Sequence, residues 1–204
     1  MSKQKQKIDN PHKRKMEKLK KNIDASINAA NRQRGIGILL TGNGKGKSTS
    51  AFGMVIRSLG YNHKVGIVQF IKGQQLSGEE IYIRDKCPSV TFHQMSTGFT
   101  WETQDRSTDI AAAKKSWSKA EKMLKDNNFD LIVLDELTYM LSFKYLDEDK
   151  VIHALKHRPI HQSVVVTGRG GGAALKSWAD TVSEIKATKH AYNQGIMARK
   201  GVDL

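Results

Sequence analysis

The chain has 204 residues, a net charge of +14 and a single cysteine, Cys87. This length suits one well-buried domain with a short extension, and no apolar run reaches the roughly 18 residues that a membrane-spanning helix needs. One cysteine excludes an internal disulfide, and the lysine-rich start lacks the apolar core of a secretory signal peptide. The composition therefore predicts a cytoplasmic protein without a membrane segment.

Residues 1–34 are predicted to be a basic N-terminal arm, partly helical or disordered. They hold eleven Lys or Arg against three acidic residues, a net charge of +8, whereas the other 170 residues carry +6. Such an arm is typical of a solvated tail, of a nucleic-acid contact, or of a contact with an acidic protein. It lacks the interleaved aromatic residues that stack on bases, which disfavours nucleic acid. Its apolar residues recur at helical spacing and predict a helix that forms on contact: Met16, Leu19, Ile23 and Ile27.

The stretch TGNGKGKST, residues 41–49, is similar to a phosphate-binding loop but has one departure from the usual G-x-x-x-x-G-K-[ST] spacing. Threonine stands where the first glycine is expected. An apolar run before the stretch and a helical pattern after it supply the required order of strand, loop and helix. Loop amides and the helix N-terminus favour a bound anion. We therefore expect these residues to bind nucleotide phosphates: Thr41, Gly42, Asn43, Gly44, Lys45, Gly46, Lys47, Ser48 and Thr49.

Apolar runs and helical patterns alternate along residues 35–204. Strands are predicted within residues 35–40, 63–73, 89–95, 129–141, 163–172 and 180–188, and helices within 48–60, 105–128 and 147–159. Ser107 or Thr108 is expected to cap the second of these helices. This alternation predicts a single α/β domain like the phosphate-loop NTPases of the RecA-like type, with a parallel sheet covered by helices on both faces. Ligands of such a fold bind at the carboxyl ends of the strands.

Two acidic residues and two arginines are candidates for the same site. Asp135 and Glu136 end an apolar strand, where an acid would help to hold magnesium beside the Ser48 hydroxyl. The alternative is that these carboxylates cap a helix. Arg57 on the helix after the loop and Arg169 on a glycine-rich loop would neutralise phosphate charge, or would simply be solvated.

The segment MSTGFTWETQDR, residues 95–106, places two large aromatics, Phe99 and Trp101, in a loop rich in glycine and threonine. Aromatics in such a loop either anchor it to the core or contact a ligand or partner. Together with VGIVQFIKG, LIVLDELTYM, RPIHQSVVVTGRG and VSEIKATKHAYNQGIMARKGVDL, this segment closely resembles the corrinoid adenosyltransferases of the ATP:cob(I)alamin class. The resemblance extends over about residues 35–204, with the motifs in the same order.

The resemblance implies a reaction and its participants. Members of this family transfer the 5′-deoxyadenosyl group of ATP to the Co(I) centre of a reduced corrinoid and release inorganic triphosphate. The nucleotide is understood to lie reversed in the phosphate loop, and the displaced glycine at Thr41 is compatible with this cradle. By resemblance, Ser48 and Glu136 hold Mg²⁺ or Mn²⁺, while Arg57 and Arg169 contact phosphates.

The resemblance also assigns the aromatic loop and the partners. Phe99 and Trp101 match aromatics that pack against the lower face of the corrin and displace its axial base, which eases reduction of cobalt. The family is homodimeric, its N-terminal segment folds over a site, and an acidic flavodoxin-like protein supplies the electron. The rival functions are a phosphate-loop ATPase or kinase acting at the γ-phosphate, a nucleic-acid-binding motor, and a nucleotide-dependent switch without catalysis.

Overall fold

The computed structural model describes residues 3–71, 76–95 and 105–203. Its contacts divide the chain into two compact units, Met1–Gln33 and Arg34–Leu204. Each unit is described by itself.

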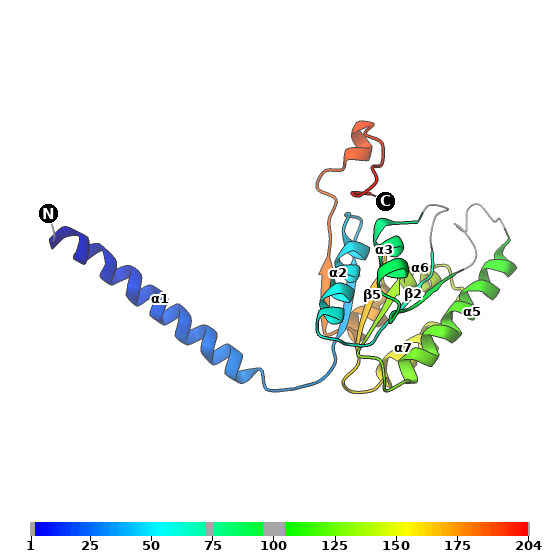
Figure 1. Ribbon diagram of the computed structural model, residues 1–204, viewed down its shortest axis with the longest axis horizontal. Coiled ribbons are helices and arrows are strands. Elements are labelled where there is room, and N and C mark those ends of the chain that lie inside the picture. Colours follow the sequence, from blue (N-terminus) through cyan, green and yellow to red (C-terminus); the bar gives the residue numbers. More distant parts are fainter. Residues whose placement is uncertain (1–2, 72–75, 96–104, 204) are drawn as a thin grey trace. The chain divides into compact units, whose positions relative to one another are not determined.

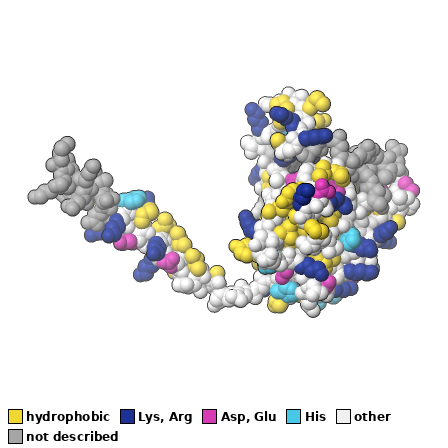
Figure 2. All heavy atoms as spheres, in the orientation of Figure 1, with side chains coloured by type: hydrophobic (Ala, Val, Ile, Leu, Met, Phe, Trp, Pro, Cys, Tyr) yellow, Lys and Arg dark blue, Asp and Glu magenta, His cyan; other side chains and the backbone are white. Residues whose placement is uncertain are grey.

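The first unit is a single helix, α1 (Lys3–Ala29), which contains Pro11. Its apolar residues follow the predicted spacing, and four of them are 40 to 64% exposed: Met16, Leu19, Ile23 and Ile27. Figure 2 shows hydrophobic side chains in a row along this helix, with basic side chains beside them. The helix is therefore amphipathic, with its apolar face uncovered within this unit.

The second unit is built on six parallel strands: β1 (Gly37–Thr41), β2 (Val65–Gln69), β3 (Thr91–Gln94), β4 (Leu131–Asp135), β5 (Ser163–Thr167) and β6 (Thr181–Glu184). Their order across the sheet is β3-β2-β4-β5-β1-β6 (Figure 1). β2 and β4 are buried at every position, and β5 at every position except its first, because helices cover both faces. The predicted α/β domain with a parallel sheet is confirmed.

Two helices pack on one face of the sheet, α2 (Lys47–Gly60) and α3 (Gly78–Lys86). The opposite face carries α5 (Arg106–Lys125), α6 (Leu137–Ser142), α7 (Glu148–Lys156) and α8 (Gly172–Trp178), and a 3₁₀ helix, η1 (Ala191–Gln194), follows β6. Neither α3 nor α8 was expected from the sequence, and the strand predicted within residues 129–141 ends at Asp135 and is followed by α6. None of the helices in the described ranges is long and apolar enough to cross a membrane.

The N-terminal cap of α5 differs from the prediction. Asp105, rather than Ser107 or Thr108, precedes the helix, and its carboxylate accepts hydrogen bonds from the backbone N–H groups of those two residues. Hydrogen bonds from the hydroxyls of Thr108 and Ser107, together with these backbone bonds, lower the pKa of Asp105 to about 2. A carboxylate satisfies two free N–H groups at once and also matches the helix dipole.

Candidate nucleotide site

Four polar residues end neighbouring strands at the carboxyl edge of the sheet: Thr41 on β1, Gln69 on β2, Asp135 on β4 and Thr167 on β5. All four are at least 95% buried. Parallel strands bring these ends together next to the loop that connects β1 to α2. The predicted phosphate loop and the acidic end of β4 therefore lie at the same edge of the sheet.

The phosphate loop runs from Thr41 into the first turn of α2. Lys47 is 9% exposed, and its Nζ donates a hydrogen bond to the Gly44 carbonyl at 2.7 Å. Burial lowers the pKa of Lys47, although the charge of Glu136 opposes this change. Asn43 and Lys45 are exposed, while Ser48 is half-buried. The loop thus offers one buried and one exposed lysine to an anion.

Glu136 lies in an unusual environment for an acidic residue. It adopts a left-handed conformation with φ 59° at the start of α6, and its side chain makes no capping hydrogen bond. Its Oε2 atom is buried without a hydrogen-bond partner. Burial raises the pKa of Glu136 to about 7, the Asp135 charge adds to this, and Lys47 and Arg169 oppose it. The carboxylate is therefore poised to accept a cation rather than to cap a helix.

Asp135, in contrast, already has partners for both of its oxygens. Its Oδ1 accepts a hydrogen bond from the Thr167 hydroxyl at 2.6 Å, and its Oδ2 accepts one from Gln69 Nε2 at 2.9 Å. The same Thr167 hydroxyl accepts the backbone N–H of Glu136 at 3.0 Å. Asp135 therefore positions the strand ends and Glu136. Gln69 and Thr167 were not among the predicted site residues, although both close apolar strands with a polar side chain at the edge where ligands were expected.

Two hydroxyls fix the glycine-rich loop that follows β5. The Thr41 hydroxyl donates to the Gly170 carbonyl at 2.7 Å, and the Thr138 hydroxyl donates to the Arg169 carbonyl at 2.9 Å. The backbone of this loop is therefore tied to β1 and to α6. The Arg169 side chain is exposed, and its charge acts on both Lys47 and Glu136. Threonine at position 41 thus has a structural contact that glycine could not make.

Glycines 42 and 44 are required by a close neighbour, the chain that follows β6. A Cβ atom at Gly42 would lie 2.3 Å from the Ile185 carbonyl oxygen, and one at Gly44 would lie 2.8 Å from the Ile185 side chain. Gly42 also has a positive φ of 102°. The positions of these glycines therefore follow from how residues after β6 pack on the loop.

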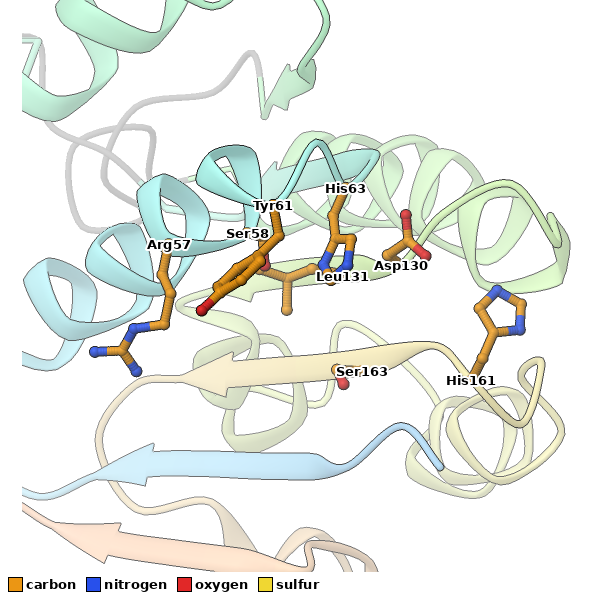
Figure 3. Close-up of a pocket in the computed structure, with 8 residues that line it drawn as sticks. All are labelled: Arg57, Ser58, Tyr61, His63, Asp130, Leu131, His161 and Ser163. Carbon is orange, nitrogen blue, oxygen red and sulfur yellow. The ribbon is translucent and has the colours of Figure 1, made fainter. Parts of the chain in front are cut away.

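The structure does not bring Arg57 to this site. It lies in the last turn of α2, at the opposite end of that helix from Lys47. There it lines a cavity of about 440 Å³ with Tyr61, His63 and residues at the amino ends of β4 and β5, Leu131 and Ser163 (Figure 3). In the close-up, Arg57 and Tyr61 come from α2 and its C-terminal turn. Phe99 and Trp101 lie outside the described residues.

The site has the features of a phosphate-loop nucleotide-binding protein of the α/β class. These are a buried lysine in a glycine loop, a helix that begins at that loop, and a carboxylate at the end of a neighbouring strand. The profile of the family described as ATP:corrinoid adenosyltransferase BtuR/CobO/CobP matches residues 33–204. The chain belongs to this family. Its activity is accordingly adenosyl transfer from ATP to a corrinoid, as the resemblance predicted.

Individual relatives agree with the family assignment. The chain is 48% identical to a corrinoid adenosyltransferase of Pseudomonas aeruginosa over 195 residues, which cover 96% of each chain. It is 46% identical to the corrinoid adenosyltransferase CobA of Salmonella typhimurium and 44% identical to the Escherichia coli K12 enzyme, in each case over 96% of this chain and 98% of the relative. Among solved structures, the flagellar accessory protein FlaH of Methanocaldococcus jannaschii aligns with a TM-score of 0.48 and 12% identity, over 74% of this chain and 71% of FlaH.

Proposed function

We propose that the chain transfers the 5′-deoxyadenosyl group of ATP to the Co(I) centre of a reduced corrinoid and releases inorganic triphosphate. The observation that supports this best is the match of residues 33–204 to the corrinoid adenosyltransferase family. The buried Lys47 and the buried, unbonded Oε2 atom of Glu136 are consistent with it. The leaving group is highly charged, so the protein must supply positive charge and position. Cobalt is the nucleophile, and the reaction needs no serine, cysteine or histidine base.

Ser48 and Glu136 are the proposed ligands of Mg²⁺ or Mn²⁺. Both offer oxygen atoms, which these cations prefer. The Oε2 atom of Glu136 lacks a hydrogen-bond partner, whereas both oxygens of Asp135 are occupied. A bound cation would neutralise part of the triphosphate charge. The residues present therefore fit a divalent cation at Glu136.

The remaining negative charge on the phosphates would be neutralised by Lys45, Lys47, Arg169 and the backbone amides of the loop. Lys47 is held in place by the Gly44 carbonyl, and Arg169 lies on a loop that Thr138 fixes to α6. Arg57 is left out of this set because it lines the cavity at the amino ends of the strands. The proposed phosphate contacts thus come from segments that meet at one edge of the sheet.

The corrinoid side of the reaction is proposed from the family resemblance. Phe99 and Trp101 would pack against the lower face of the corrin, displace the axial base and exclude water from that position. An added electron enters an orbital directed along that axis, so loss of the axial ligand makes reduction to Co(I) easier. A homodimer, a cytoplasmic location and an acidic flavodoxin-like reductant complete the proposal, with the net charge of +14 favouring such a partner.

The decisive experiment is anaerobic. The protein is mixed with ATP, Mg²⁺ and chemically reduced cob(I)alamin, the visible spectrum is followed, and the phosphate product is identified. A light-sensitive Co–C species together with inorganic triphosphate is the expected result. Formation of ADP and phosphate without a corrin spectral change would instead favour an ATPase or kinase acting at the γ-phosphate.

A further inference from the structure

The chain after β6 lies directly against the phosphate loop. Its first residue, Ile185, donates its backbone N–H to the Thr41 carbonyl at 2.8 Å and accepts the Gly44 N–H at 2.7 Å. These two bonds continue the pairing of β6 with β1 into the loop itself. Residues 185–203, here called the C-terminal segment, lie above the loop that precedes α2 (Figure 1).

The C-terminal segment returns to the loop through Asp203. The Oδ1 atom of Asp203 lies 3.1 Å from Nζ of Lys45, the exposed lysine of the phosphate loop. The Oδ2 atom accepts the backbone N–H of Arg199 at 3.0 Å, and the Asp203 N–H donates to the Arg199 carbonyl at 2.8 Å. The backbone hydrogen bond from Arg199 and, next, the hydrogen bond from Lys45 lower the pKa of Asp203. A tight turn thus presents a charged carboxylate to Lys45.

This contact conflicts with a polyphosphate in the loop. Lys45 belongs to the set of groups proposed above to neutralise phosphate charge. Asp203, which is negatively charged like phosphate, forms an ion pair with this lysine. A polyphosphate carries several negative charges and attracts Lys45 more strongly than one carboxylate does. It also repels Asp203, which is 31% exposed and has water as an alternative partner. The two anions therefore compete for one lysine.

We propose that Asp203 is a competing anion for the phosphate loop: it holds Lys45 when the loop is empty, and polyphosphate displaces it. Binding then frees the turn at residues 199–203, and its return helps to expel the inorganic triphosphate product. The inference rests on the proposed function in one respect, the binding of polyphosphate by this loop. An ion pair of this exposure changes affinity only modestly, by about two- to fivefold.

The test is the affinity of the Asp203→Asn variant for inorganic tripolyphosphate in the presence of Mg²⁺, measured by calorimetry. We expect the variant to bind about two- to fivefold more tightly than the unaltered protein, since the competitor is removed. Glu121→Gln is the matched control, because it removes the same charge from a surface pair with Lys125 on α5. An equal gain in the control, or no gain in Asp203→Asn, overturns the inference.

Hydrogen exchange of the unaltered protein gives an independent readout. The N–H groups of Val202 and Asp203 both donate to the Arg199 carbonyl, so their exchange reports the turn. Faster exchange on addition of tripolyphosphate is expected, whereas slower exchange would mean that the segment closes over the ligand and would overturn the inference. Absence of tripolyphosphate binding in every variant would overturn the proposed function as well, which distinguishes the two failures.

Discussion

At the scale of single residues, Glu136 is the group whose state decides what the site can hold. Its carboxylate is buried, lacks a partner for Oε2 and has a pKa of about 7. Below about pH 7, a carboxyl group in this condition binds a proton when no cation is present. Cation affinity and proton affinity are therefore opposed at this residue, and both belong to the same oxygen atoms.

This opposition predicts how the stability of the cation-free protein depends on pH. The pKa of Glu136 is raised from 4.5 to about 7, so the folded state binds more protons than the unfolded state between these values. Stability contributed by Glu136 is therefore lost as pH rises through this window, by about 3 kcal/mol at most. Urea unfolding in the presence of a chelator from pH 4.5 to pH 7.5 measures the loss. It should be absent in Glu136→Gln, and identical slopes in both proteins would contradict the assignment.

The proposed corrinoid contact of Trp101 can be tested by substitution. Trp101→Ala should bind ATP normally yet lose adenosylation when a weak protein reductant supplies the electron. The reason is that the axial ligand would no longer be displaced and Co(II) would resist reduction. Chemically prepared cob(I)alamin serves as the control, because it bypasses the reduction and should restore much of the rate. Full activity with the protein reductant would reject this role.

At the scale of elements, the phosphate loop and α2 contain two glycines, Gly44 and Gly53, that lie in opposite surroundings. Gly44 is buried against Ile185 and Lys186, where a Cβ atom would lie 2.8 Å from both residues. Gly53 lies on the exposed side of α2, where an added Cβ atom would have no neighbour within 4 Å. One glycine is fixed by packing, and the other only weakens its helix.

Alanine at these two positions should therefore have opposite effects. Gly44→Ala is expected to lower the free energy of unfolding by about 1 to 3 kcal/mol and to weaken nucleotide binding, since the chain after β6 must move. Gly53→Ala is expected to raise stability by about 0.5 to 1 kcal/mol through helix propensity. Denaturant unfolding and nucleotide titration measure both. A Gly44→Ala protein as stable as Gly53→Ala would show that the loop does not need this close packing.

The elements also show what the sequence could and could not predict. Strands with long apolar runs, such as residues 131–135, and helices with a clear period were located, because burial on a parallel sheet imposes those patterns. The short helices α3, α6 and α8 were missed because each has at most nine residues, too few for a clear apolar period. Ser77 with Glu80 three residues later was a usable capping signal for α3. The predicted helix over residues 48–60 already implied that Arg57 lies about three turns from the phosphate loop, and the family resemblance alone assigned it to phosphate. The Lys45–Asp203 contact joins residues far apart in sequence, and no local pattern signals it.

At the scale of the whole molecule, the two units differ in what stabilises them. Residues 34–204 enclose two buried apolar clusters, one on each face of the sheet. Helix α1 is exposed over residues 11–29, where it carries both charged side chains and an apolar row. We therefore expect the stability of the domain to depend on residues 34–204, and the charge of +8 in residues 1–34 to act in association with an acidic partner.

A variant without residues 1–33 tests this division. Its thermal midpoint should stay within a few degrees of the full-length value, and it should still bind ATP, because the apolar clusters and the phosphate loop remain intact. Adenosylation driven by an acidic protein reductant should become slower at low salt and lose part of its salt dependence. A large fall in the thermal midpoint would instead show that α1 contributes to the core.

The pairing partners of β1 determine when this strand can fold. This strand leads into the phosphate loop, yet it pairs only with strands at residues 163–167 and 181–184 within the described sheet. During synthesis from the N-terminus, β1 leaves the ribosome long before either partner exists. Such distant pairing slows folding, because a long loop must close first. The earliest segment of the nucleotide site is thus among the last to reach its final structure, and a chain that stops short of β6 leaves it unfinished.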